Sequence, residues 1–333
     1  MRLRLAALSV TGALVLAACA GSSPTRGARA PIWPGSAATH PGRGPSHLSV
    51  ARDTRVLRLN LLVAERDDRL LSISPRGQVV WRLRQSDPTQ VFVSATGRTL
   101  LISESRRSLV AMRRVDNHQV SFVYRGLDAP ETALETAGGA LVIADPARCT
   151  VDFVSPAARR ALQTLGSAGA CVHDPPRTFA APDAAFPAAH GELVVTERDP
   201  AWLDVLSAHD RLLEAVHLAG WSAASDASAY ASGDLIVTER SDPGEVEELG
   251  AGGRAIWRYG PSSGPGELDR PALARVLGGG DVLVVDSGND RVIVIDPRSG
   301  AIVWQYGHTA IAGTRAGYLD DPQSATLVPL GGA

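Results

Sequence analysis

The chain is poor in several residue types and motifs that would point to a particular chemistry. Only three of its 333 residues are cysteine and only three are asparagine. The formal net charge is −2 and no block of basic residues occurs, so nucleic acid is not an expected partner. H-E-x-x-H, C-x-x-C, EF-hand and phosphate-loop motifs are absent, so no metallohydrolase, dithiol, calcium or nucleotide site is indicated. Helical periodicity is nearly absent as well, with its best instance at 156–165.

The N-terminus has the pattern of a secretory signal. Arg2 and Arg4 precede an apolar stretch of about a dozen residues, which is too short to form a stable transmembrane helix. Residues 16–19, Leu-Ala-Ala-Cys, resemble the lipobox of bacterial lipoproteins, which implies cleavage before Cys19 and lipid attachment to its sulfur. An ordinary cleaved signal with a chance cysteine is the alternative. We expect a signal peptide at 1–18, a lipidated Cys19 with a tether rich in Gly, Pro, Ser and Ala at 19–45, and a folded domain at 46–333.

The folded domain contains six related segments. In DVLVVDSGNDRVIVIDPRSGAIVWQYG, at 281–307, three short apolar runs are separated by tight turns. Weaker copies begin near Leu61, Leu100, Leu141, Leu193 and Leu235. A spacing of about 40–50 residues with several short strands per copy is typical of propeller blades. In every copy the first run stops at an acidic residue, and these residues are Glu65, Glu104, Asp145, Glu197, Glu239 and Asp286.

A fourth apolar run precedes most copies, usually after a proline, and fits the innermost strand of a blade. The first copy lacks such a run, whereas PQSATLV at 322–328 follows the last copy. We therefore predict an all-β, six-bladed propeller in which the C-terminal strand pairs with the first blade and removes the open sheet edges. Residues 47–54 have no place in this scheme and leave seven blades as an alternative.

Two stretches of the sixth copy resemble known repeats. VVDSGNDRVIVID resembles the NHL repeat, and GAIVWQYG resembles the outer strand of PQQ-like quinoprotein repeats. The chain as a whole resembles secreted bacterial NHL/PQQ-like propellers. A quinone-dependent oxidoreductase is the least favoured reading, because the quinoprotein dehydrogenases have longer chains and clustered Asn, Asp and Glu for calcium. We predict no cofactor and no metal site.

The repeated residues are interpreted as structural. The six acidic residues form what we call the acidic column, in which each carboxylate is expected to accept backbone N–H groups from a turn or a neighbouring blade. A ring of carboxylates that binds a cation is the alternative. Trp81, Trp257 and Trp304 are expected to pack between blades. Propeller topology brings Cys149 and Cys171 to the same face, and an even pair in an extracytoplasmic protein predicts a disulfide.

The irregular loops gather on one face of the predicted propeller, which we call the loop-rich face. Candidate catalytic residues on it are His173, His308 and Arg315, and candidate ligand-binding residues are Arg177, Tyr318, Asp320 and Asp321. The favoured hypothesis is a monomer held at the extracytoplasmic side of a bacterial membrane by its lipid, which binds a protein, peptide or glycan through this face. The alternative is an enzyme similar to NHL-type lyases, lactonases or arylsulfotransferases, in which His173 or His308 transfers a proton.

Overall fold

The computed structural model describes residues 57–328 except 67, 95 and 231. The predicted signal peptide, Cys19, the tether and residues 47–54 lie outside the described residues. The described strands form six antiparallel sheets of four strands each, which confirms the six-bladed β-propeller. Residues 160–166 form a strand, not a helix. No helix in the described part of the chain has the length and apolarity needed to span a membrane.

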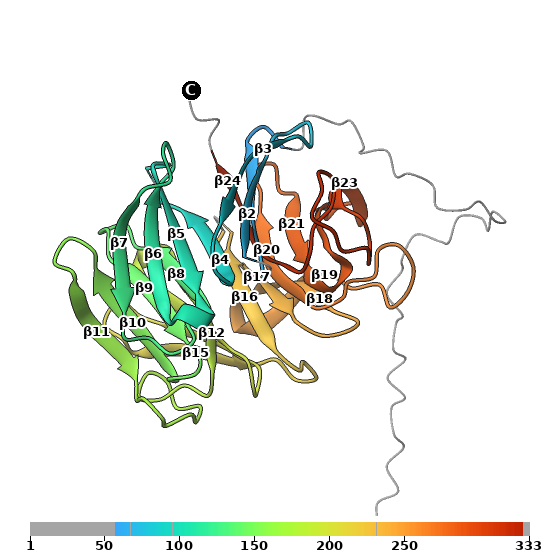
Figure 1. Cartoon of the computed structure of the whole chain (residues 1–333). Coiled ribbons are helices and arrows are strands. Elements are labelled where there is room, and N and C mark those ends of the chain that lie inside the picture. Colours follow the sequence, from blue (N-terminus) through green and yellow to red (C-terminus); the bar gives the residue numbers. More distant parts are fainter. Residues whose placement is uncertain (1–56, 67, 95, 231, 329–333) are drawn as a thin grey trace, which may run out of the picture. The chain divides into compact units, whose positions relative to one another are not determined.

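Each blade consists of four strands, which are given below in order from the channel outward and called the first to the fourth strand of the blade (Figure 1). Blade 1 contains β24 (Pro322–Val328), β1 (Asn60–Glu65), β2 (Arg69–Ile73) and β3 (Val79–Arg84). Blade 2 contains β4 (Pro88–Val93), β5 (Thr99–Glu104), β6 (Leu109–Arg114) and β7 (Val120–Arg125). Blade 3 contains β8 (Thr132–Glu135), β9 (Leu141–Asp145), β10 (Thr150–Ser155) and β11 (Arg160–Gly166).

The remaining three blades repeat the same order. Blade 4 contains β12 (Pro182–Pro187), β13 (Leu193–Glu197), β14 (Trp202–Leu206) and β15 (Leu212–His217). Blade 5 contains β16 (Ala224–Ala229), β17 (Leu235–Glu239), β18 (Glu245–Gly250) and β19 (Arg254–Tyr259). Blade 6 contains β20 (Pro271–Val276), β21 (Val282–Asp286), β22 (Arg291–Asp296) and β23 (Ala301–Gly307).

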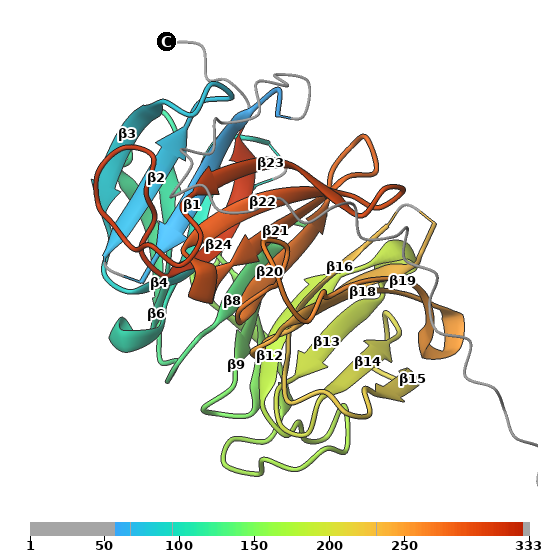
Figure 2. The same ribbon diagram turned by 90° about the vertical axis from the view of Figure 1, so that its right-hand side faces the viewer.

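The C-terminal strand closes the ring, as predicted. β24 pairs antiparallel with β1, and the register runs from Asn60 opposite Val328 to Ala64 opposite Ser324 before a bulge. Figure 2 shows β24 beside β1, and β24 also contacts β4 and β20 in the neighbouring blades. Residues 322–328 therefore supply the inner strand of the first blade, so the inner edge of β1 is paired.

The burial pattern follows from the stacking of blades. All five residues of β21 are buried because the sheets of neighbouring blades cover both of its faces, which accounts for its run of aliphatic residues. The outer strand β3 instead alternates between half-buried and exposed positions, as expected for an edge strand. Trp304 packs in one cluster with Leu71 and Ala325 and so joins blade 6 to blade 1. The aromatic side chain contributes to the inter-blade core, as its repeated position suggests.

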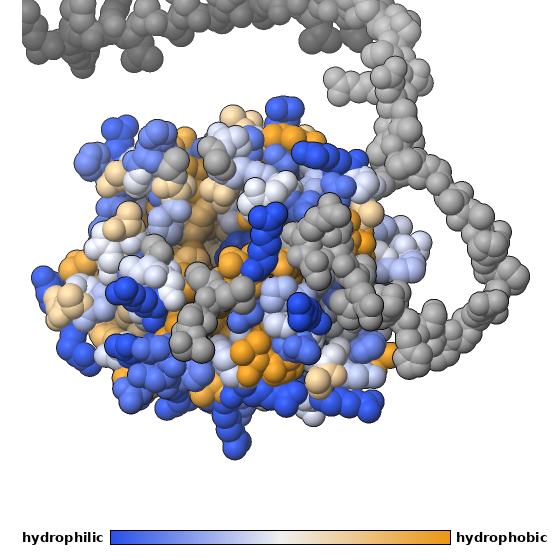
Figure 3. Space-filling model, turned by 90° about the horizontal axis from the view of Figure 1, so that it is seen from above, coloured by the Kyte–Doolittle hydropathy of each residue, from blue (hydrophilic) through white to orange (hydrophobic). Residues whose placement is uncertain are grey.

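Two kinds of loop share the loop-rich face. They are the turns between the second and third strands of each blade and the segments that connect one blade to the next, and they point downward in Figure 1. The hairpins between third and fourth strands lie at the other end. That end is seen in Figure 3, where hydrophilic side chains surround recessed apolar patches.

Candidate functional site

The acidic column lies at the loop-rich end of the second strands, and its carboxylates are buried in five of the six blades. Asp286 accepts a hydrogen bond from the Asp269 backbone N–H at 2.8 Å, and Asp145 accepts one from Asp128 at 2.7 Å. The corresponding donors are the backbone N–H groups of Asp320 for Glu65, Ala180 for Glu197 and Ser222 for Glu239. In each case the donor belongs to the loop that enters the same blade. These five carboxylates thus attach the connecting loops to the sheets, whereas Glu104 pairs with Arg107 at 3.0 Å.

Cys149 and Cys171 form the predicted disulfide, with their Cα atoms 5.3 Å apart. Cys149 follows the turn between β9 and β10, and Cys171 lies in the loop between β11 and β12. The bond therefore secures the loop at 167–181, which also carries His173 and Arg177. Arg177 forms an exposed ion pair with Asp174 at 2.9 Å.

His173 turns from this loop into blade 4. Its Nδ1 lies 2.8 Å from Oε1 of Glu197 and 3.8 Å from Oδ2 of Asp204, and its ring stacks on Trp202 at a centroid distance of 4.0 Å. Glu197 and Asp204 have no exposed side-chain surface. Burial, and secondly the neighbouring Glu197 carboxylate, raise the pKa of Asp204 to about 9.

His308 belongs to a second cluster, in the loop between β23 and β24. Its ring contacts Tyr318 at a centroid distance of 4.2 Å, and the Arg315 guanidinium lies 4.7 Å from the centroid of the same tyrosine. The contacts recorded for His173 involve blade 4, and those of His308 involve blade 6 and the final loop. The structure thus groups His308 with Arg315 and Tyr318, and His173 shares no contact with them among the described residues.

Asp320 and Asp321 lie at the entry to β24. The Asp320 backbone N–H donates to Glu65 at 2.7 Å. The Asp321 carboxylate pairs with Arg66 at 3.2 Å and accepts a hydrogen bond from the Gln323 side chain at 2.6 Å. These two residues therefore hold the start of β24 in place at the mouth of the channel.

The channel mouth holds a network of charges. Arg198 forms ion pairs with Asp183 and with Glu131, the latter at 3.5 Å. Arg66 and Arg240 both donate to Oε1 of Gln323, at 2.9 and 2.7 Å. Burial raises the pKa values of Glu131 and Asp183, and their mutual repulsion adds to the rise at Glu131.

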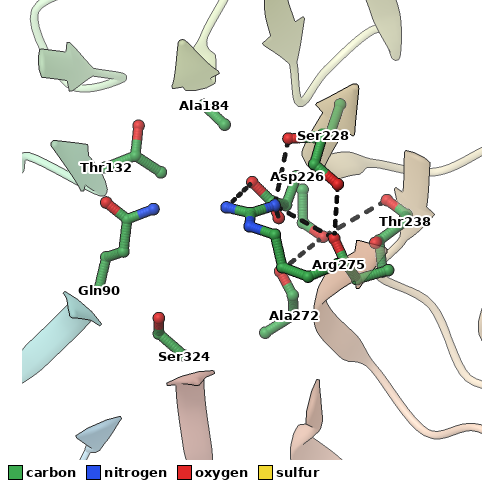
Figure 4. A network of polar contacts seen from close by, with 12 residues as sticks. Gln90, Thr132, Ala184, Asp226, Ser228, Thr238, Ala272, Arg275 and Ser324 are labelled. Carbon is green, nitrogen blue, oxygen red and sulfur yellow. Dashed lines mark hydrogen bonds and ion pairs between the residues drawn. The ribbon is translucent and has the colours of Figure 1, made fainter. Parts of the chain in front are cut away.

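Deeper in the channel, side chains from the inner strands face one another (Figure 4). Arg275 reaches from β20 to Asp226 of β16, with Nη2 3.3 Å from Oδ1. Burial raises the pKa of Asp226 to about 6, although Arg275 opposes the shift. The free space along this ring is only about 20 Å³, which is enough for about one water molecule. This space is too small to hold an organic ligand.

A larger cavity lies along the outer strand of blade 6. We call it the seam groove, and it is lined by residues that include Arg76, Gly77, Trp304, Tyr306, His308 and Gly317. Its volume of about 310 Å³ is within the range of ligand-binding pockets. The groove runs between β23 and the β2–β3 hairpin, so it exists because blade 1 closes against blade 6. Nε1 of Trp304 is buried and has no hydrogen-bond partner among the described residues.

Sequence reasoning missed two parts of this arrangement. Asp204 was not singled out, although an acidic residue inside LDVL, in a strand covered on both faces, is a usable signal. Trp304 was assigned to packing alone, and its unpartnered Nε1 depends on side-chain placement. The loop after β19 also contains Gly260-Pro261-Ser262-Ser263-Gly264, which has G-x-S-x-G spacing but lacks the strand–turn–helix context of a nucleophile elbow.

No family model matches the chain, and no curated protein matches it. Among solved structures, a protein of unknown function from Bacteroides caccae is 17% identical and covers 80% of this chain and 97% of its own, with a TM-score of 0.61. The WD40 β-propeller domain of Doa1 is 11% identical and covers 81% and 82%, with a TM-score of 0.58. Virginiamycin B lyase from Staphylococcus aureus is 10% identical and covers 78% and 86%, with a TM-score of 0.53. At these identities the similarity establishes the β-propeller fold alone.

Proposed function

We propose that the protein is a lipid-anchored, extracytoplasmic binding propeller of the NHL/PQQ-like type, and that it captures an extended segment of a partner protein in the seam groove. The observation that carries the proposal is a cavity of about 310 Å³ beside an edge strand. The channel, with about 20 Å³, has no room for such a ligand.

The chemistry of the groove supports a peptide ligand. β23 is the outermost strand of its sheet, so its free edge can pair with an extended backbone by strand addition. Ile302 and Val303 offer apolar surface beside Trp304. A ligand acceptor that reaches the buried Trp304 Nε1 through a shift of the side chains around it would satisfy a group that otherwise has no hydrogen bond among the described residues.

The positions of the histidines favour binding over the enzyme alternative. A shared acid–base site would require His173 and His308 to face a common substrate. Each is instead engaged by its own neighbours, Glu197 for His173 and Tyr318 for His308. We therefore propose no acid–base site that combines the two histidines.

Photocrosslinking in the native membrane tests the seam groove. A photoreactive amino acid in place of Ile302 is expected to capture one discrete partner protein, through a contiguous segment identified by mass spectrometry. Leu213 is the matched control, because it is 55% exposed on β15, another outermost strand. Trp304→Phe should reduce the yield from Ile302 roughly fivefold by removing one donor, since a hydrogen bond contributes about 1 kcal/mol. Identical products from both positions, no product, or a glycan product would contradict the proposal.

The lipid anchor makes a separate prediction. Cys19→Ser removes the sulfur that would carry the lipid, so the variant should leave the membrane fraction and appear in the soluble extracytoplasmic fraction. Fractionation followed by immunoblotting measures this, with Ser22→Ala as the control that stays in the membrane. Retention of Cys19→Ser at wild-type levels would refute the anchor.

A further inference from the structure

Blade 4 departs from blades 1 and 6 at the acidic column. In blades 1 and 6 an arginine faces the column carboxylate across the hairpin, Arg69 opposite Glu65 and Arg291 opposite Asp286. In blade 4 the corresponding residue is Trp202, opposite Glu197. The Glu197 carboxylate is fully buried and its recorded side-chain contact is with His173, not with an arginine. The positive charge that faces the column carboxylate in blades 1 and 6 is missing here.

A second buried carboxylate adds to this deficit of positive charge. Asp204 lies two residues beyond Trp202 in β14 and is fully buried, and neither of its oxygens accepts a hydrogen bond among the described residues. Ala215 stands opposite it in β15 and has no polar side-chain group to offer. The nearest polar side chains to Asp204 are the Glu197 carboxylate and Nδ1 of His173 at 3.8 Å, and no arginine or lysine is paired with it among the described residues. Burying two neighbouring carboxylates costs several kcal/mol unless positive charge balances them, so the pair calls for a compensating group.

The equivalent acidic residues of neighbouring blades have such partners. In blade 3, Asp152 of β10 accepts a hydrogen bond from Thr164 of β11. In blade 5, Glu247 of β18 pairs with Arg258 of β19. Among these three equivalent positions, only Asp204 lies opposite a side chain without a hydrogen-bonding group, Ala215. The difference points to a ligand that is specific to blade 4.

The three side chains are arranged around a common point. Nδ1 of His173 lies 2.8 Å from Glu197 Oε1 and 3.8 Å from Asp204 Oδ2, and one potential ligand atom from each residue falls within 4.8 Å of the others. Ligands bound at about 2.0–2.2 Å to one ion lie about 3–4 Å from each other, so small side-chain shifts suffice. The 9° stacking on Trp202 holds the imidazole, and the Ala180 N–H holds the second Glu197 oxygen. Such supporting contacts orient metal ligands.

We propose that His173, Glu197 and Asp204 bind one divalent transition-metal ion, of the Zn²⁺ or Mn²⁺ class. A dication neutralises two buried carboxylates, and a set of one imidazole and two carboxylates suits these metals. His173 retains 19% exposure, which leaves a route from solvent. Cys149 and Cys171 are not ligands because they are joined in the disulfide. This site differs from the seam groove and departs from the absence of a metal predicted from the sequence.

Metal titration of the purified, tag-free full chain tests the site. After chelator treatment, calorimetric titration with Zn²⁺ or Mn²⁺ should show one saturable site per chain, and the metal should raise the thermal unfolding midpoint. Asp204→Asn and His173→Gln should each weaken the affinity roughly 100-fold or more by removing a ligand. Asp152→Asn and His217→Gln are matched controls, since the former changes the equivalent strand position and the latter the second histidine that contacts Trp202. Both should bind as the wild type does.

Two outcomes would overturn the proposal. One is that the stripped wild type shows no saturable binding of Zn²⁺ or Mn²⁺ at submillimolar concentration. The other is that Asp204→Asn binds with wild-type affinity while its thermal midpoint shows that it is folded. In either case the pair of carboxyl groups is held by a proton instead, and Asp204→Asn should raise the thermal midpoint without metal. Mass spectrometry of the metal content after native purification gives an independent reading.

Discussion

A chain that ends at Asp321 will not form a stable propeller. It lacks the seven residues of β24, of which Pro322, Gln323, Ser324, Ala325 and Val328 are buried. The inner edge of β1 then has no partner, and β4 and β20 lose the strand that lies between them. The lost packing is comparable with the whole stability of an ordinary domain, about 5–15 kcal/mol. We expect no cooperative thermal transition, together with aggregation through the exposed strand edge.

Differential scanning calorimetry and the soluble yield measure this effect. The matched control is a chain that ends at Val328 and keeps the whole of β24. It should retain the wild-type transition. Equal transition temperatures for the two truncated chains would show that closure of the propeller ring does not depend on β24.

Arg291→Met is expected to destabilise the fold by about 3–5 kcal/mol, because it leaves a buried carboxylate without its partner. Arg291 is 1% exposed and donates to Asp286 at 2.7 Å, to the Pro265 carbonyl at 2.9 Å and to the Glu267 carbonyl at 2.8 Å. Methionine cannot replace any of these bonds. The free energy of unfolding from urea titration measures the loss. The matched control is Arg114→Met, whose ion pair with Asp116 is more than half exposed, so its loss should leave the free energy of unfolding nearly unchanged.

The defect of Arg291→Met should also depend on pH. Burial already raises the pKa of Asp286 above its ordinary value, and Arg291 opposes that rise. Without the guanidinium the folded-state pKa rises further, so the folded variant binds a proton over a pH range where the unfolded chain has released it. Its stability therefore falls as pH increases through that range and recovers toward acid. The deficit relative to wild type should be smaller at pH 5 than at pH 8, and an equal deficit would argue against an uncompensated Asp286.

The architecture was predictable because propeller repeats leave a periodic record. The acidic residue at the end of each second strand is visible in sequence, and the orphan segment at 322–328 matched the missing inner strand of the first copy. The pairing of Cys149 with Cys171 followed from the same topology, which places their loops on one face. These inferences depend on strand order and need no side-chain detail.

The candidate sites were less predictable because they depend on deviations from the repeat. The spacing of His173 from Glu197 does not reveal that its loop folds back into blade 4. The seam groove arises where the first and last blades meet, so its lining combines Arg76 with Trp304 and His308 from the other end of the chain. Irregular loops and the ring junction carry no periodic signal, and the sites within them depend on where individual side chains lie.

Both the channel mouth and the seam groove depend on the union of the two chain ends, and a cysteine pair tests that union directly. Asn60 and Val328 are Cα partners in the β1–β24 register. Under mild oxidation, Asn60→Cys with Val328→Cys should form an intramolecular disulfide that joins the two peptides in a mass map of the monomer, whereas Leu162→Cys with Val328→Cys should not. If the first pair stays reduced and both thiols are alkylated in the folded protein, the last strand does not complete the first blade.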